Sequence, residues 1–221
     1  MLFRDRRDAG RQLAERVAER SGSLGPSPTV LALPRGGVPV GFEVAHRLRV
    51  PLDVFVVRKL GVPGHEELAM GAIATGDVVV LSSDLIESLE IPDEMIRRRI
   101  EIERRELERR ERAYRTGPPP HITGHGVLLV DDGLATGATM LAAIAALRKL
   151  DAARISVAVP VASPDTCRDI GSDVDVIVCA ETPEPFYGVG GWYDDFSQTT
   201  DDEVRALLRA SRGEAPSAEA T

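Results

Sequence analysis

The chain has 221 residues, of which 43% are hydrophobic and 28% charged, and its formal net charge is −8. This size and composition fit one sizeable soluble domain with additions, and the acidic balance argues against a nucleic-acid partner. Its two cysteines, Cys167 and Cys179, lack a CxxC motif, so we expect reduced structural thiols. No signal core or bilayer-spanning apolar run is present. We therefore expect a cytoplasmic protein with no membrane partner.

The N-terminal part of the chain alternates helical and strand patterns. Apolar spacing predicts a helix over residues 5–20, a buried strand over 29–33 and a helix over about 39–49. Pro34-Arg35-Gly36-Gly37 joins the strand to the second helix. A Gly-Gly pair lets the backbone approach a ligand closely, and Arg35 adds a forked cationic donor set. Taken alone, such a segment is usually only a turn.

A second strand, predicted over 52–57, ends in Arg58 and Lys59. Cations at the carboxyl end of a parallel strand face the crevice in which α/β proteins bind ligands. A solvated pair at a strand end is the alternative. Residues 61–71 mix Gly, Pro and charges and predict a mobile loop that can act as a lid. Residues 72–81 predict a β-hairpin that turns at 75–77.

The most charged element is a long helix predicted over residues 92–115. Glu–Arg pairs at i,i+3 and i,i+4 support it locally, and at 1.5 Å per residue it is roughly 35 Å long. Its arginines alone would suggest RNA, but interleaved carboxylates favour a projecting or packing helix with a solvated face. It is also a candidate dimer contact.

The most informative segment covers residues 127–140. A buried parallel strand ends on Asp131 and Asp132, and a helix begins near Ala138 after a small-residue loop. Loop amides at a helix N-terminus suit a phosphate, and the Thr136 and Thr139 hydroxyls add hydrogen bonds. The two carboxylates would repel a phosphate and instead suit hydroxyl donors such as a ribose diol. The implied ligand is a sugar phosphate.

Residues 130–139, Val-Asp-Asp-Gly-Leu-Ala-Thr-Gly-Ala-Thr, resemble the PRPP-binding motif of type I phosphoribosyltransferases. The resemblance covers about 29–179 and implies an α/β fold with a mostly parallel central sheet flanked by helices. A capping turn needs one Asp, not two followed by Thr-Gly-Ala-Thr, so that alternative is weaker. In the family the acidic pair binds the ribose hydroxyls. The 5-phosphate would bind at Ala135, Thr136, Gly137, Ala138 and Thr139.

The resemblance also implies a reaction. The 5-phosphoribosyl group of PRPP would pass to a nitrogenous acceptor, expected to be a nucleobase, with release of pyrophosphate. Mg²⁺ would enter with PRPP rather than through a direct protein ligand. Pyrophosphate would bind at Arg35, Gly36, Gly37, Arg58 and Lys59, with a cis peptide expected at Arg35–Gly36. The catalytic set would be Asp131, Asp132, Lys59, Glu66 and Glu67.

The group that deprotonates the acceptor stays open. Hypoxanthine–guanine relatives carry an Asp immediately before Thr-Gly in the PRPP loop, where this chain has Ala135. Adenine-type relatives share the Ala, and the loop resembles theirs most closely. Glu66 or Glu67 of the lid is the remaining candidate base. His65 is more typical of a surface loop histidine.

The C-terminal part completes the predicted sheet with strands over 154–161 and 174–179, which gives about five parallel strands. The loop over 181–200 holds five of the chain's nine aromatic residues. By resemblance it is a hood whose aromatic rings stack on the nucleobase. Packing of the same rings against the sheet edge is an equal alternative. The hood candidates are Trp192, Tyr193 and Phe196.

We expect a single domain over residues 1–212, with an insertion over 61–125, a disordered tail over 213–221 and a homodimeric assembly. The main alternative is a regulator that binds PRPP or a nucleotide without catalysis. The charges of Arg35, Arg58 and Lys59 favour the enzyme. A fold that binds an unrelated phosphosugar is a third possibility, but it has no need of the Arg-Gly-Gly loop.

Overall fold

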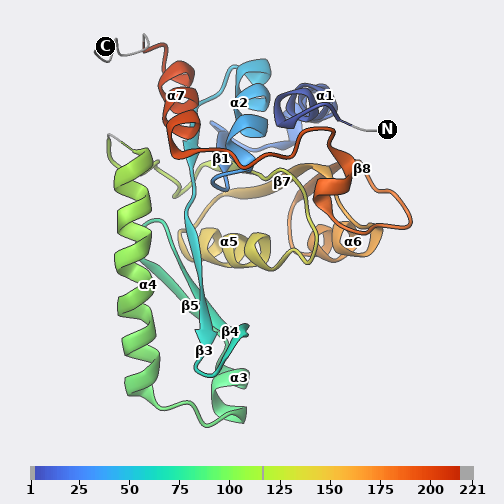
Figure 1. Ribbon diagram of the computed structural model, residues 1–221. Helices are drawn as coiled ribbons and strands as arrows, with labels where there is room; N and C mark the ends of the chain where they lie inside the picture. Colours follow the sequence, from blue (N-terminus) through green and yellow to red (C-terminus); the bar gives the residue numbers. More distant parts are fainter. Residues whose placement is uncertain (1–2, 116, 215–221) are drawn as a thin grey trace.

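The computed structural model describes residues 3–115 and 117–214, apart from the side chains of Glu66 and Glu67 (Figure 1). Five parallel strands form the central sheet in the order β2–β1–β6–β7–β8. Their bounds are β1 (Thr29–Ala32), β2 (Leu52–Val54), β6 (Gly126–Val130), β7 (Arg154–Val161) and β8 (Val176–Glu181). The predicted parallel sheet is confirmed, and β6 lies at its centre.

Helices cover both faces of this sheet (Figure 1). Successive side chains of a strand point to opposite faces, so Leu128 and Val130 join the core beneath α1 and α2, while Leu129 packs with Met140 and Leu147 of α5. One face carries α1 (Arg6–Ala18), α2 (Gly37–Leu48) and α7 (Asp201–Ser211), and the other carries α5 (Ala138–Lys149) and α6 (Pro164–Ser172). The α/β architecture predicted from the sequence is therefore confirmed. Short 3₁₀ turns, η1 (Ser21–Ser23) and η2 (Val189–Trp192), lie in connecting segments.

An antiparallel sheet of β3 (Val57–Val62), β4 (His65–Ala74) and β5 (Val78–Leu81) extends away from the main body (Figure 1). The strand predicted over 52–57 is split, because β2 ends at Val54 and the chain crosses to the second sheet through Phe55 and Val56. The backbone N–H of Val56 donates to Thr75 Oγ1 at 2.9 Å, which begins the pairing of β3 with β4. The placement of Arg58 and Lys59 at the end of a parallel strand was therefore wrong, since both lie within antiparallel β3.

The predicted mobile loop over 61–71 is also wrong. These residues belong to β3 and β4, which pair from Val57↔Ala74 to Val62↔His65 across a tight turn. Gly64 in that turn has a φ of 82°, which glycine adopts at little cost. The next hairpin, with Ala74 paired to Val78 around residues 75–77, is as predicted.

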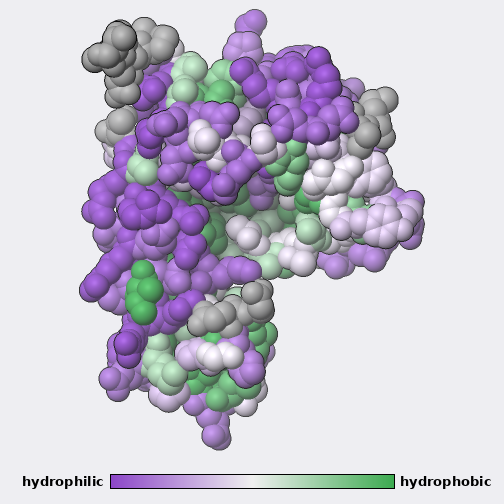
Figure 2. Space-filling model, in the orientation of Figure 1, coloured by the Kyte–Doolittle hydropathy of each residue, from purple (hydrophilic) through white to green (hydrophobic). Residues whose placement is uncertain are grey.

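Helix α3 (Ser83–Ser88) leads into α4 (Asp93–Tyr114), a 22-residue helix that packs on the antiparallel sheet (Figure 1). Ile96 and Leu107 are buried on its inner side, and its outer surface is largely hydrophilic in Figure 2. This agrees with the predicted packing helix. None of the helices in the described residues has the length and apolar content to cross a membrane.

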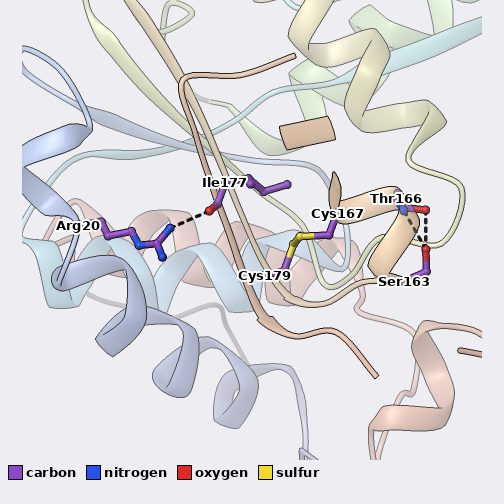
Figure 3. The surroundings of a disulfide bond; sticks show 6 residues. All are labelled: Arg20, Ser163, Thr166, Cys167, Ile177 and Cys179. Carbon is purple, nitrogen blue, oxygen red and sulfur yellow. Dashed lines mark hydrogen bonds between the residues drawn. A yellow bond between two sulfur atoms is a disulfide. The ribbon is translucent and has the colours of Figure 1, made fainter. Parts of the chain in front are cut away.

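Cys167 on α6 and Cys179 on β8 form a disulfide, so the prediction of two reduced thiols is wrong (Figure 3). Helix α6 returns the chain from β7 to β8 and brings the two Cα atoms to 6.6 Å, within the range of a disulfide. Their sequence separation of 12 residues gave no local signal of this contact.

We predict that replacing both cysteines, as Cys167→Ser/Cys179→Ser, lowers the free energy of unfolding by about 2–4 kcal/mol under non-reducing conditions, because the closed loop no longer restricts the unfolded chain. Urea unfolding of both proteins measures the difference. The two proteins should become similar when the wild type is reduced by a dithiol. Equal stability without reductant would contradict the prediction.

Candidate functional site

Two adjacent carboxylates lie at the carboxyl end of β6, whose five residues are all buried. The Oδ1 atom of Asp131 accepts a hydrogen bond from the Asp132 backbone N–H at 2.9 Å. Burial, and next the charge of Asp132, raise the pKa of Asp131 well above its usual range. The fold therefore holds a carboxylate pair in an unfavourable environment at the sheet edge where α/β proteins bind ligands.

Arg6, at the start of α1, forms an ion pair with one member of this pair. Its Nε lies 2.7 Å from Asp132 Oδ2, and its NH1 atom donates to the Ser197 carbonyl at 2.6 Å. The guanidinium carbon lies 3.9 Å from the centroid of the Phe196 ring. Arg6 was not predicted as a site residue, because it is one of several arginines in a charged helix and lies 126 positions from Asp132.

The loop between β1 and α2 packs directly against the acidic pair. A Cβ atom on Gly36 would lie 2.0 Å from Asp132 Oδ2, and one on Gly37 would lie 2.6 Å from the Val130 carbonyl oxygen. The φ of Gly36 is −59°, so close approach rather than backbone conformation requires glycine there. The Gly-Gly backbone thus approaches the protein's own carboxylates closely, and its approach to a ligand stays a prediction.

The cis peptide of this loop joins Pro34 to Arg35. It was predicted one residue later, at Arg35–Gly36, so that position was wrong; the local sequence does not distinguish the two bonds. Arg35 is partly exposed, and its NH1 atom lies 3.6 Å from Asp201 Oδ1 at the start of α7. Asp201 also accepts a hydrogen bond from the Tyr114 hydroxyl at 2.8 Å.

The loop from β6 to α5 alternates anchored and exposed residues. Leu134, Gly137 and Met140 are buried. Gly137 begins α5 with a φ of 70°, and a Cβ atom there would lie 2.8 Å from Ile170 Cδ1 of α6. The exposed residues are Ala135, Thr136, Ala138 and Thr139. The loop therefore presents small, exposed side chains at the N-terminus of α5, the end of a helix that favours an anion.

Helix α6 supports this loop from behind. The Thr166 hydroxyl donates to the Ala135 carbonyl at 2.7 Å and accepts from the Ser163 hydroxyl at 2.8 Å. Thr166 directly precedes the disulfide-bonded Cys167 (Figure 3). The α6–β8 disulfide is thus adjacent to the residue that holds the loop carbonyl.

The cations of β3 point to different partners. Arg58 donates to the buried Glu103 carboxylate of α4, with NH2 2.7 Å from Oε2. Lys59 is exposed and lines a cavity of about 230 Å³ with Ala138 and Ala142 of α5. Only Lys59 of this pair thus lies beside the α5 N-terminus. The side chains of the candidate bases Glu66 and Glu67 lie outside the described residues, so those assignments remain predictions.

The aromatic residues of the C-terminal loop make mostly internal contacts. Tyr193 is buried, and its hydroxyl donates to the Asp132 carbonyl at 2.6 Å, while burial raises its pKa far above the usual range. The ring centroids of Phe196 and Tyr193 are 4.9 Å apart, and Trp192 is partly buried. Tyr187, which the sequence analysis did not assign, is 93% exposed. Tyr193 at least serves to fold the loop onto the acidic pair.

Among the described residues, no cluster of three or more His, Cys, Asp or Glu side chains is arranged to hold a metal ion. Asp131 and Asp132 are nevertheless adjacent oxygen donors of the kind that Mg²⁺ prefers.

The chain resembles known proteins over most of its length. A family model described as "Phosphoribosyl transferase domain" matches residues 6–190. Two Mycobacterium tuberculosis proteins, from strains CDC 1551 and H37Rv and both named putative phosphoribosyl transferases, are 46% identical over 217 residues. These matches cover 96% of this chain and 47% of each relative, so the chain spans about half the length of the curated relatives it matches. TT1426 from Thermus thermophilus, a crystal structure, is 42% identical with a TM-score of 0.83, covering 94% of this chain and 98% of that one.

We predict that Gly36→Ala lowers the free energy of unfolding by about 1–3 kcal/mol, because the new Cβ must displace an Asp132 carboxylate held by Arg6. Gly22→Ala is the matched control, since nothing lies within 4 Å of its Cβ position, and it should change stability by less than about 0.5 kcal/mol. Urea unfolding measures both. Equal stabilities of the two variants would contradict the close packing.

We also predict that Asp131→Asn stabilises the fold at neutral pH. The folded-state pKa of Asp131 lies above its unfolded value. As pH rises from the unfolded pKa through the folded pKa, the wild type therefore loses stability that the amide retains. Urea unfolding at pH 4 and pH 7 should show the advantage of the variant growing with pH. An advantage that shrinks over this interval would contradict the sign of the shift.

Proposed function

The chain belongs to the phosphoribosyl transferase domain family, and on that premise we propose that it is a phosphoribosyltransferase that transfers the 5-phosphoribosyl group of PRPP to a nitrogenous acceptor. The observation that carries the proposal is the arrangement at the end of β6. Two adjacent carboxylates pack against a Gly-Gly loop and are followed by an exposed small-residue loop at the N-terminus of α5. A sugar that carries a diol and a phosphate matches this arrangement, since the diol can bind the carboxylates and the phosphate can bind the loop.

Asp131 and Asp132 accept hydrogen bonds from the ribose hydroxyls. Carboxylates are strong acceptors for hydroxyl donors when ionised. The transition state develops positive charge on the ribose ring as pyrophosphate leaves, and two fixed carboxylates nearby stabilise that charge. Burial and the neighbouring charge of Asp132 raise the pKa of Asp131, so holding both carboxylates in this position lowers the stability of the fold.

The 5-phosphate binds the loop over residues 135–139. Its exposed amides and the Thr136 and Thr139 hydroxyls are donors, and the α5 dipole favours an anion. Gly137 is buried against Ile170 and adopts a left-handed backbone conformation, with a φ of 70°, at the start of α5.

Pyrophosphate binds beside Arg35, Gly36, Gly37 and Lys59. The pairing of Arg35 with Asp201 is long and exposed, so it is a weak competitor for phosphate oxygens. Arg58 is held by a buried carboxylate, and we assign it to anchoring α4 rather than to direct contact with pyrophosphate.

Mg²⁺ is expected to enter with PRPP, bound largely by phosphate oxygens and water. When bound, it neutralises phosphate charge and so assists departure of the leaving group.

The acceptor is proposed to be a nucleobase covered by the loop over 181–200. Trp192 and Phe196 are the hood residues with ring surface remaining, because Tyr193 is committed to the Asp132 carbonyl. Ala135 leaves no carboxylate at that loop position, so Glu66 or Glu67 remains the proposed base. A cytoplasmic homodimer is proposed with this activity.

A PRPP-binding regulator is the second candidate. One observation favours it: two of the cations suited to the leaving group, Arg35 and Arg58, are paired with carboxylates of α7 and α4. A protein that binds PRPP without catalysis has no need of free cations at that position.

A pyrophosphate-release assay with PRPP and Mg²⁺, against a panel of nucleobases and other amine acceptors, separates the two. We expect release with at least one acceptor and loss of release in Asp131→Asn/Asp132→Asn, because the ribose contacts and the transition-state charge stabilisation are both removed. PRPP binding by calorimetry without any release would favour the regulator. Absence of PRPP binding would refute both proposals.

A further inference from the structure

Arg6 joins three parts of the molecule that are distant in sequence. Its guanidinium bonds to Asp132 of β6 at 2.7 Å and to the carbonyl of Ser197 at 2.6 Å, and it stacks on the Phe196 ring. Neighbouring backbone contacts continue this junction, since the Phe3 N–H donates to the Trp192 carbonyl at 2.8 Å and the Asp195 N–H donates to the Arg4 carbonyl at 2.9 Å. The N-terminal segment thus closes over the end of β6 together with the C-terminal loop.

The Arg6–Asp132 pair is more buried than the neighbouring ion pair on the same helix. The side chains of Arg6 and Asp132 are only 12% and 16% exposed. Arg7, the next residue, pairs with Glu43 at the same 2.7 Å distance but is 52% exposed. A largely buried arginine needs fixed partners, and Arg6 has two hydrogen-bond acceptors and an aromatic face.

The Arg6 Nε contact uses one acceptor position of the Asp132 carboxylate. Arg6 Nε contacts Oδ2, and a carboxylate offers about four acceptor positions over its two oxygens. Arg6 can therefore remain in place when a hydroxyl group binds Oδ1. Its contact fixes the direction of the carboxylate.

We propose that Arg6 is a positioning residue for the acidic pair, which aims the Asp132 carboxylate at the ribose hydroxyls and couples that carboxylate to the Phe196–Ser197 segment. This inference rests on the proposed function and assigns to α1 a part in the site that the motif residues do not provide. Arg6 acts through Asp132 and does not itself contact the reacting atoms.

Within the described residues, two charged or titratable side chains from other elements bond to the acidic pair. Arg6 of α1 binds the Asp132 carboxylate, and the Tyr193 hydroxyl donates to the Asp132 carbonyl. Asp195, whose carboxylate accepts from the Ser197 N–H at 2.9 Å, interacts with Arg6. Arg6 is the cation among them, and its charge lowers the pKa of Asp131 against the larger effect of burial. Removing Arg6 should therefore raise the pKa of Asp131 further.

The test compares Arg6→Ala and Arg6→Lys with Arg7→Ala, a matched control on the same helix. Calorimetry with PRPP and Mg²⁺ measures affinity between pH 5 and pH 8. For Arg6→Ala we expect affinity to fall about tenfold or more, because a charge-assisted contact that orders the carboxylate is lost. The pH at which binding is half lost should also rise, a shift that a general loss of folding would not produce. Arg7→Ala should match the wild type in both measurements.

Arg6→Lys keeps the charge but not the forked donors. Because the charge is kept, we expect PRPP binding by Arg6→Lys to have the same pH midpoint as binding by the wild type. We expect the affinity to be lower than in the wild type, because one ammonium cannot reproduce the contacts to both Asp132 and Ser197. This variant carries the test if Arg6→Ala does not fold. Affinity equal to wild type in Arg6→Lys would overturn the positioning role.

Two further results would overturn the inference while leaving the proposed function intact. One is wild-type affinity and pH dependence in Arg6→Ala. The other is tighter PRPP binding by Arg6→Ala, which would mean that Arg6 competes with the ribose for Asp132. Failure of the wild type itself to bind PRPP would instead refute the proposed function, and the inference with it.

Discussion

The electrostatic problem of two adjacent aspartates at the end of a buried strand explains much of the surrounding structure. Asp131 and Asp132 repel each other, and burial raises the pKa of Asp131. Three contacts accommodate the pair. Arg6 forms an ion pair with Asp132, and the Asp132 backbone N–H donates to the Asp131 carboxylate. The Gly-Gly loop packs closely against the pair because it has no side chains. An arrangement that opposes stability in this way is typical of a site retained for its chemistry.

The N-terminal segment and the loop that precedes α7 meet beside the same pair. Tyr193 binds the Asp132 carbonyl, Phe3 packs on the Tyr193 ring at 5.5 Å, and Arg6 lies between Asp132 and Phe196. The N-terminal helix and the C-terminal loop therefore meet over the carboxyl end of β6, although neither contains part of the recognised motif. Tyr193 and Phe196 contribute to this junction, so less of their ring surface is available to the proposed nucleobase acceptor.

Local patterns predicted the parts of the site that follow one another along the chain. The apolar strand, acidic pair and small-residue loop before α5 are consecutive, and their spacing alone indicated a sugar phosphate. The split after Val54 was not predictable in this way, because 52–57 is apolar without a period that marks the crossing to β3. Three contacts between residues distant in sequence could not be predicted either: Arg6 with Asp132, Arg58 with Glu103, and Cys167 with Cys179. For the two ion pairs, the sequence offers many other arginines and carboxylates that could have paired instead.

The buried Glu103 connects the inserted helix to the strand that carries Lys59. Because Glu103 is nearly inaccessible and accepts from Arg58, removing the guanidinium would leave this buried carboxylate of the α4–β3 interface with the longer contact to Arg99, at 3.4 Å, and without its closer partner. Arg58 and Lys59 point to opposite sides of β3, as neighbours on a strand must, so fixing Arg58 on α4 turns Lys59 toward the cavity beside α5. Arg58 thus attaches β3 to α4, and Lys59 on the other side of β3 faces the cavity beside the N-terminus of α5.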